Sequence, residues 1–267
     1  MRVAVVGHVE WIDFLLVERV PGPGDIAIAE DSWGEAAGGG GVSCVRLAEL
    51  AGESTLFTAL GDDDFGRDAA AQLTKLGVRC EIAWRDERQR RGFCFLDGDG
   101  ERTISLLSDK LRPRVNEPLP WDDLREFDGV YFTGGDAGAL GAAREARVLV
   151  ATARELQTIQ EAGVELDALV ASAKDPAERY EEGDLDPSPR TVFLSAGKEG
   201  GTIDPGGLRW EAEDLPGSIA DEYGAGDTFA AWLTFALAQG RPPEEAARFA
   251  AGGSAEQLTR RGAHGLH

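Results

Sequence analysis

The chain has 267 residues, of which 42% are hydrophobic, enough for one large α/β domain with an appendage or for two small domains. Its formal net charge of −21, from 48 acidic and 27 basic residues, argues against nucleic acid or an anionic membrane as a partner. No apolar run reaches the roughly 18 residues of a membrane-spanning helix, and we expect no signal peptide. The three cysteines have no metal-ligand spacing, which predicts reduced thiols in a cytoplasmic protein, two of them in the core.

The first half of the chain alternates predicted strands and helices, with two β units that interrupt the alternation. The opening strand is short and apolar, as is typical of a parallel sheet that is buried on both faces. Each interrupting unit is a pair of strands around turn residues, at 21–24 and at 97–100. The predicted elements are strands at 2–6, 11–20 and 26–33, a helix at 42–50, a strand at 55–60, a helix at 67–76, and strands at 91–96 and 103–107.

The second half alternates more regularly, which predicts a doubly wound, mostly parallel α/β sheet with helices on both faces. The two interrupting units, about 11–36 and 88–107, do not fit this alternation and are predicted to form a small antiparallel flap beside the sheet. We therefore expect a single domain over 1–267. The predicted elements are strands at 129–133, 147–151, 168–172 and 191–195, helices at about 137–147, 154–162 and 176–181, a β pair at 200–204 and 208–212, and helices ending at 240 and about 259.

The stretch from Ile219 to Gly240 carries the strongest candidate site. Apolar residues at three- and four-residue spacing predict a helix in its second half. Gly224, Ala225 and Gly226 lie where this helix begins, and small residues there leave the first backbone N–H groups uncovered. These groups and the helix dipole form a site for an anion, most naturally a phosphate. Asp227 is then either an N-terminal cap or a general base that takes a proton from a hydroxyl group.

Two glycine-rich stretches are further candidates for ligand binding. Gly38–Gly41 has no Cβ atoms, so its amides can approach a substrate closely; the alternative is a flexible connection. Ser195–Gly201 follows a predicted strand and either wraps a nucleotide or forms a tight turn, and its glycine spacing is not that of a P-loop. Val6–Glu10 lacks the glycines of a dinucleotide fingerprint, which weakens a dehydrogenase interpretation.

Four motifs in a fixed order carry a resemblance to a known family. They are the glycine run near residue 40, LGDDDFG at 60–66, SAGKEGG at 195–201 and DEYGAGDTF at 221–229, followed by AARFA at 246–250 and TRRGA at 259–263. In combination they resemble the ribokinase-like (PfkB-type) carbohydrate kinase family over nearly the whole chain. The resemblance implies a ribokinase-like α/β fold, in which the two β units form a lid that closes over the sugar and excludes water.

The resemblance also implies phosphoryl transfer from ATP to a sugar-type hydroxyl group. By position, Asp227 corresponds to the catalytic base and the amides of residues 224–226 to the anion hole, which favours the base over the cap. Such roles suit a transition state that needs mostly positioning and neutralisation of spread-out negative charge. The family's nucleotide loop is matched by Ser195, Gly197 and Gly200.

The expected metal sites also come from the resemblance. Asp175 and Glu178 fall where the family carries an Asn-x-x-Glu motif that organises Mg²⁺ through water molecules, and Asp in place of Asn keeps the oxygen ligand. The alternative is a helix-start cap and a first-turn acid. Asp221 matches a residue that some members use near a monovalent cation such as K⁺, and its alternative is a solvated loop. The expected cofactors are thus ATP and Mg²⁺, with K⁺ as a further candidate.

The departures from the family lie mostly in the substrate half. The family usually places a sugar-binding Asp after the first strand, where the register here gives Ile12, with Asp13 one place later and Glu10 two before. A shift of one residue along a strand turns a side chain to the opposite face. The family's glycine run leads to an Asn that contacts the sugar, and this chain has Val42 and Ser43 instead. The candidate substrate-binding residues are Glu10, Asp13, Gly39, Gly40 and Ser43, with His8 and Trp11 as further candidates.

We therefore expect a Mg²⁺- and ATP-dependent kinase of a small sugar or sugar-like alcohol. A nucleoside kinase of the same family shares the chemistry and differs only in the pocket. A catalytically silent, ligand-binding regulator with the same fold is favoured by the eroded sugar motif. It is disfavoured by the intact sequence Gly224–Asp227, since a binder has no need for a base inside an anion hole. The expected partner is a small molecule, and the lid is a candidate surface for a homodimer.

Overall fold

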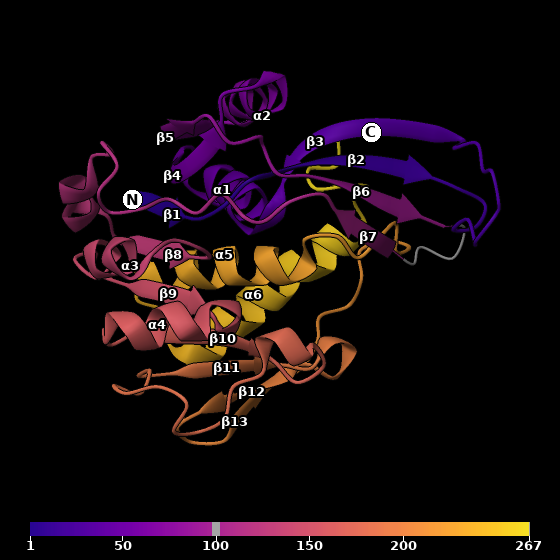
Figure 1. Ribbon diagram of the computed structural model, residues 1–267. Coiled ribbons are helices and arrows are strands. Elements are labelled where there is room, and N and C mark those ends of the chain that lie inside the picture. Colours follow the sequence, from indigo (N-terminus) through magenta and orange to yellow (C-terminus); the bar gives the residue numbers. More distant parts are fainter. Residues whose placement is uncertain (98–101, 267) are drawn as a thin grey trace.

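The computed structural model describes residues 1–97 and 102–266, and their strands form two sheets (Figure 1). The larger sheet has the strand order β13-β12-β11-β10-β9-β8-β1-β4-β5, and the smaller has the order β3-β2-β6-β7. The strands are β1 (Val3–Val6), β2 (Glu10–Leu16), β3 (Asp31–Ala37), β4 (Ser54–Gly61), β5 (Val78–Arg85), β6 (Arg91–Leu96), β7 (Arg102–Leu106), β8 (Gly129–Phe132), β9 (Leu149–Thr152), β10 (Ala168–Ser172), β11 (Val192–Ser195), β12 (Gly201–Asp204) and β13 (Leu208–Trp210). The helices are α1 (Gly38–Ala51), α2 (Asp64–Lys75), η1 (Trp121–Glu126), α3 (Ala137–Ala143), η2 (Ala153–Glu155), α4 (Leu156–Ala162), η3 (Pro176–Glu178), η4 (Gly197–Glu199), α5 (Ala225–Ala238) and α6 (Pro243–Leu258).

Helices cover both faces of the larger sheet, as the side chains of β1 show. Val3 and Val5 pack into the core formed with α1, α2, α5 and α6, whereas Ala4 and Val6 pack into the core formed with α3 and α4. All four side chains are buried, as a strand between two helical layers requires. In the order of the larger sheet, the strands from β5 to β11 pair in parallel, and the pairs β11–β12 and β12–β13 are antiparallel. The predicted doubly wound, mostly parallel α/β sheet is confirmed.

The strand order reverses at β1, which has β4 on one side and β8 on the other. In open α/β sheets, ligands bind outside the carboxyl ends of the strands at such a reversal. His8 follows β1 and Thr133 follows β8, so these two residues flank that point. The loops after β9, β10 and β11 open at the same edge because these strands run parallel to β8.

The smaller sheet is the predicted flap, and Figure 1 shows it projecting to one side of the larger sheet. β2 pairs antiparallel with β3, and β6 pairs antiparallel with β7, as predicted. The two units join through β2 and β6, which are parallel, so the flap is not wholly antiparallel. Ile12 and Phe14 of β2 pack against Val42 and Tyr223, which anchors the flap to the body of the molecule.

The glycine run is the first turn of a helix and not a flexible connection. α1 begins at Gly38, ahead of the predicted start at Val42. A Cβ on Gly40 would lie 2.5 Å from the carbonyl oxygen of His8, and one on Gly38 would lie 2.9 Å from Cγ of Glu10. The turn is pressed against the loop after β1 so closely that only glycine fits.

β5 is a strand that the sequence pattern did not predict. It lies at the edge of the larger sheet, and charged residues at Arg79, Glu81 and Arg85 lower its apolar content. Other predicted elements are shorter or shifted, and the turn predicted at 97–100 lies mostly outside the described residues. The corrected elements are η3 in place of a helix at 176–181, α3 in place of 137–147, β2 in place of 11–20, and β3 in place of 26–33.

Within the described residues, no helix combines the length and the apolar character that a membrane crossing requires. Cys44 and Cys94 are buried, Cys80 is half-buried, and all three are free thiols. Burial raises the pKa of the Cys94 thiol to about 12, so this thiol stays protonated at neutral pH. The two predicted core positions are confirmed.

Phe57→Ala is expected to lower the free energy of unfolding by about 3–5 kcal/mol, because it leaves a cavity in the core beside η1. Phe57 is 1% exposed, and its ring centroid lies 5.7 Å from that of Trp121 and 6.2 Å from that of Phe127. Unfolding in guanidinium chloride would measure the loss. The control Phe57→Leu should lose less, and an equal loss in both variants would contradict this account.

Candidate active site

Helix α5 begins at the predicted anion hole. Gly224 is the N-cap residue, with a φ of 75° in the left-handed region, and Ala225 starts the helix. A Cβ on Gly226 would meet no atom within 4 Å, so this turn faces open space. Because the first N–H groups of a helix have no intrahelical acceptor, the turn presents bare amides and the positive end of the helix dipole.

Asp227 lies in this first turn, and its side chain is partly buried. The N-cap position belongs to Gly224, so Asp227 does not hold the capping role that was its alternative. A Cβ on Gly39 would lie 3.1 Å from Oδ1 of Asp227 and 2.3 Å from Oγ1 of Thr133. The carboxylate is therefore next to the start of α1 as well as the start of α5.

The start of α1 is a second helix N-terminus in the same place. Its N-cap residue, Ala37, makes no side-chain capping bond, and its first turn holds no acidic residue. The Gly38 N–H donates to the Tyr223 hydroxyl at 3.2 Å, and the Ser43 hydroxyl donates to the Asp227 carbonyl oxygen at 3.2 Å. These two bonds tie α1 to the residues around the start of α5. Two positive helix ends thus favour negative charge at Asp227.

The charge state of Asp227 depends on opposing influences. Its pKa is raised to about 6, first by burial and then by the negative charge of Glu178, while Arg154 and Arg102 act in the opposite direction. The carboxylate is therefore mostly ionised at neutral pH. A base whose pKa lies near the working pH is also the most efficient at accepting a proton.

His8 and Glu10 form another side of the site, and both are buried. His8 Nε2 lies 3.4 Å from Glu10 Oε1, and Arg90 Nε lies 2.8 Å from the same oxygen. Burial lowers the pKa of His8, so its imidazole is neutral at neutral pH although Glu10 acts in the opposite direction. The charge of Glu10 also raises the pKa of Asp227, so the two carboxylates lie within electrostatic reach of each other.

Asp13 does not join His8 and Glu10 in the site. It lies on the face of β2 opposite to Ile12, which is buried in the flap, and it pairs with Arg91 at 2.9 Å. Adjacent residues of a strand point to opposite faces, so the register separates Asp13 from Glu10 as well. The other predicted substrate-binding residues lie in α1 beside the site, and they are Gly39, Gly40 and Ser43.

The predicted nucleotide loop follows β11. The Ser195 hydroxyl donates to the carbonyl oxygen of Ala171 on β10 at 3.2 Å. Gly197 and Gly200 both have positive φ, of 62° and 75°. A Cβ on Gly200 would lie 2.1 Å from the carbonyl oxygen of Trp210, so glycine is required by the close approach of two backbones as well as by φ. This loop opens at the same edge of the sheet as the loop after β8.

Asp175 and Glu178 lie in the loop after β10, and both pair with Arg154 from the loop after β9. Arg154 Nε lies 2.6 Å from Glu178 Oε1, and the guanidinium group also contacts Asp175 Oδ2. Asp175 caps η3 as well, because its Oδ1 accepts from the Ala177 N–H at 2.9 Å. Arg154 lowers the pKa of Asp227, so this group lies within electrostatic reach of the candidate base.

Asp221 is fully buried and does not lie in a solvated loop. Its carboxylate accepts from the N–H groups of Tyr223 at 2.7 Å and Gly262 at 2.6 Å. Glu35 accepts from the Ala263 N–H at 2.6 Å. The pKa of Glu35 is raised to about 7, mainly by burial, and the nearby charge of Asp221 contributes in the same direction. The two buried carboxylates thus bind consecutive N–H groups of the loop that contains Gly262 and Ala263.

The family profile described as pfkB family carbohydrate kinase matches residues 1–183 and 164–266. The chain belongs to this family. The ATP-dependent ribose-1-phosphate kinase of Halopiger xanaduensis is 30% identical over 258 residues, which cover 88% of this chain and 86% of that protein. The ribokinase of Thermotoga maritima superposes with a TM-score of 0.79 at 20% identity, covering 98% of this chain and 94% of that chain. The ribokinase of Cryptococcus neoformans in complex with ADP has a TM-score of 0.74 at 20% identity, covering 98% and 95%. The predicted ribokinase-like fold is confirmed.

The sequence did not mark two basic residues of this carbohydrate kinase as members of the site. Arg154 and Lys174 each lie two residues after the end of a parallel strand, β9 and β10. Lys174 Nζ lies 3.5 Å from Glu199 Oε1, and a Cβ on Gly197 would lie 3.4 Å from the same nitrogen. Nothing in their spacing marks either residue. The only available signal was their place at the carboxyl edge of the sheet, where ligands bind.

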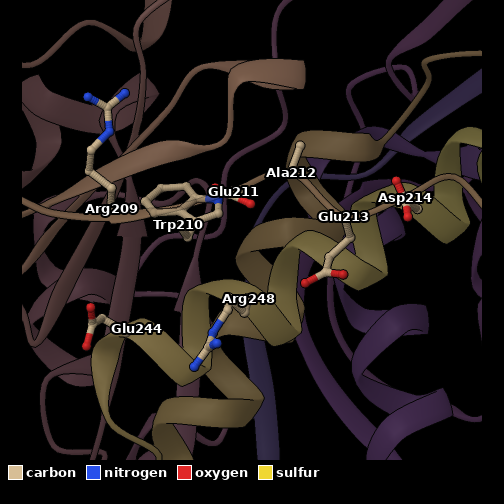
Figure 2. A pocket seen from close by; sticks show the side chains of 8 residues that line it. All are labelled: Arg209, Trp210, Glu211, Ala212, Glu213, Asp214, Glu244 and Arg248. Carbon is tan, nitrogen blue, oxygen red and sulfur yellow. The ribbon is translucent and has the colours of Figure 1, made fainter.

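A cavity of about 530 Å³ opens between α6 and the segment that includes β13 (Figure 2). The ring of Trp210 stacks on Phe229 of α5 at 5.5 Å. Carboxylates outnumber guanidinium groups around the cavity, which disfavours phosphate groups inside it. The bare amides of α5 are the better place for phosphate. The lining residues are Arg209, Trp210, Glu211, Ala212, Glu213, Asp214, Glu244 and Arg248.

Gly39→Ala is expected to lower kcat/KM by about 100-fold, because the new Cβ would displace Thr133 or the Asp227 carboxylate, and a misplacement of about 1 Å is enough for such a loss. Steady-state kinetics would measure the change. Gly141→Ala is the matched control, since a Cβ there meets nothing within 4 Å. Equal activity in the two variants would contradict the close packing described here.

The expected role of Asp227 as the base predicts that the rate falls as the pH drops through about 6, because a base must be ionised to accept a proton and the pKa of Asp227 is raised to that value. A profile of kcat/KM against pH would show this limb. Asp227→Asn should be inactive at every pH tested. Because the raised pKa means that folding disfavours the charged form, this variant should be at least as stable as the parent at pH 8. A less stable Asn variant would contradict the assigned pKa direction.

Proposed function

We propose that this carbohydrate kinase transfers the γ-phosphoryl group of ATP to a hydroxyl group of a phosphorylated pentose, with ribose 1-phosphate as the first acceptor to test. The name and the 30% identity of the Halopiger relative support both the donor and the acceptor. The intact base and anion hole support catalysis over a silent binding role, since a binder needs neither. A nucleoside acceptor remains the alternative that the same experiment addresses.

The position of Asp227 between the starts of α1 and α5 is the observation that carries the proposal. In the proposed step, its carboxylate accepts the proton of the acceptor hydroxyl as that oxygen attacks the γ-phosphorus. The bond from this phosphorus to the bridging oxygen breaks, and ADP leaves. The amides of residues 224–226 donate to the oxygens of the transferring group and balance their charge.

The fit of Mg²⁺ to this site rests on Asp175 and Glu178. Within the described residues, no three His, Cys, Asp or Glu side chains form a metal-binding group. Mg²⁺ commonly keeps several water ligands and uses one or two carboxylates, which these residues supply. Arg154 holds both carboxylates in place. When bound, Mg²⁺ neutralises charge on the nucleotide phosphates. Ser195, Gly197 and Gly200 belong to the proposed nucleotide loop, with Lys174 beside them.

A monovalent cation is proposed near Asp221 and Glu35. Burial raises the pKa of both carboxyl groups, so a positive ion nearby would favour their ionised forms. Asp221 bonds the Tyr223 N–H, next to Gly224 at the N-cap of α5. A cation there would therefore help to order the turn that precedes the anion hole.

ADP release from a panel of acceptors tests the proposed function, with ribose 1-phosphate, ribose and nucleosides as its members. We expect release with ribose 1-phosphate and a loss of about 10²- to 10⁴-fold in kcat for Asp227→Ala, the usual contribution of a general base. No transfer to any member would overturn the acceptor class. Release with nucleosides alone would favour the alternative, and full activity of Asp227→Ala would exclude its role as base.

A further inference from the structure

A second group of charges lies beside the candidate site, centred on Glu155. This carboxylate is 2% exposed, yet it meets two cations from the segment after β7. Lys110 Nζ lies 3.3 Å from its Oε1, and Arg112 contacts its Oε2. One carboxylate against two cations leaves an excess of positive charge. In a chain with a net charge of −21, such an excess next to a binding site calls for an anionic ligand.

The path from this group to Asp227 runs along the residues after β8. A Cβ on Gly134 would lie 3.8 Å from Glu155 Oε1 and 3.3 Å from His8 Nδ1. The preceding residue, Thr133, lies next to Gly39, and Gly39 lies next to Asp227. The charge of Lys110 also lowers the pKa of His8. A continuous series of neighbouring residues thus connects Lys110 to Asp227.

His8 gives independent evidence for a ligand between Lys110 and Asp227. Its ring is 5% exposed, and among the described residues Nδ1 has no hydrogen-bond partner. A buried polar atom without a partner is costly, and such atoms usually bind a water or a ligand. Because Nε2 faces Glu10, the neutral ring places its proton there and leaves Nδ1 as an acceptor. A sugar hydroxyl group is a donor of the right kind.

We infer that Lys110 and Arg112 bind the phosphate group that the acceptor already carries, and that His8 Nδ1 accepts a hydrogen bond from one of its sugar hydroxyls. The hydroxyl that receives the new phosphoryl group then lies at the other end, against Asp227. Glu155 is a positioning residue that holds both cations at the site. This inference rests on the proposed function and adds the residues that select a phosphorylated acceptor over a free sugar.

The physical basis is a charge-assisted contact between a phosphate dianion and an ammonium and a guanidinium group. Bonds to charged groups contribute about 1.5–3 kcal/mol, and removing one raises a dissociation constant by about 10- to 100-fold. A free sugar has no group to make these contacts, so its affinity depends much less on Lys110. The two acceptors therefore respond differently to the loss of one cation.

Lys110→Ala tests the inference, with binding of ribose 1-phosphate and of ribose measured by calorimetry on the nucleotide-free protein. We expect the dissociation constant of ribose 1-phosphate to rise by about 10- to 100-fold and that of ribose to change much less. Lys75→Ala is the matched control, because it removes the same charge from the exposed last turn of α2. In kinetics, KM for ribose 1-phosphate should rise while KM for ATP stays within about twofold of the parent.

Two further variants separate the loss of a ligand contact from the loss of folding. Arg112→Gln should weaken ribose 1-phosphate binding in the same selective way, and His8→Gln, which lacks the Nδ1 acceptor, should weaken ribose and ribose 1-phosphate alike. Unfolding midpoints would confirm that each variant folds. The inference is overturned if ribose 1-phosphate does not bind the parent, or if Lys110→Ala and Arg112→Gln bind it as Lys75→Ala does. Selective binding without phosphoryl transfer would support the inference and refute the proposed function.

Discussion

The structure depends on one contact, the approach of the glycine run at the start of α1 to the carboxylate at the start of α5. A Cβ on Gly39 would crowd both Thr133 and Asp227, and one on Gly40 would meet the carbonyl oxygen of His8. Without side chains at these positions, two helix N-termini converge on one carboxylate. That carboxylate keeps a pKa of about 6 and can accept a proton at neutral pH.

A chain with a net charge of −21 must capture anionic substrates by local means. In the proposed function, the bare amides at the start of α5 do this for the transferring phosphoryl group, because backbone N–H groups bind an anion without a charged side chain. Two further basic side chains, Arg154 and Lys174, lie just after strand ends. Each is held by a neighbouring carboxylate, so its position is defined even where the surrounding field is negative.

The sequence predicted the features that depend on neighbours in the chain. Gly224–Asp227 marked a helix start with an acidic residue in its first turn, because four consecutive residues suffice for both. The register argument at Ile12 and Asp13 correctly warned that these two side chains face opposite ways, since strand periodicity is local. The pattern failed at β5, whose charged residues hide an edge strand, and at Gly38–Gly41, which reads as a loop until a helix is packed onto it.

By itself, the sequence determined the alternating sheet, the flap units and the membership of the carbohydrate kinase family. Only the tertiary structure decided which charges share a space. Glu155, Lys110 and His8 come from three separate segments. Glu155 and His8 both lie near Gly134 because β1, β8 and β9 are consecutive strands of the sheet, and Lys110 pairs with Glu155. Such a meeting depends on strand order, which is set by contacts between residues far apart in the chain and leaves no mark on local spacing.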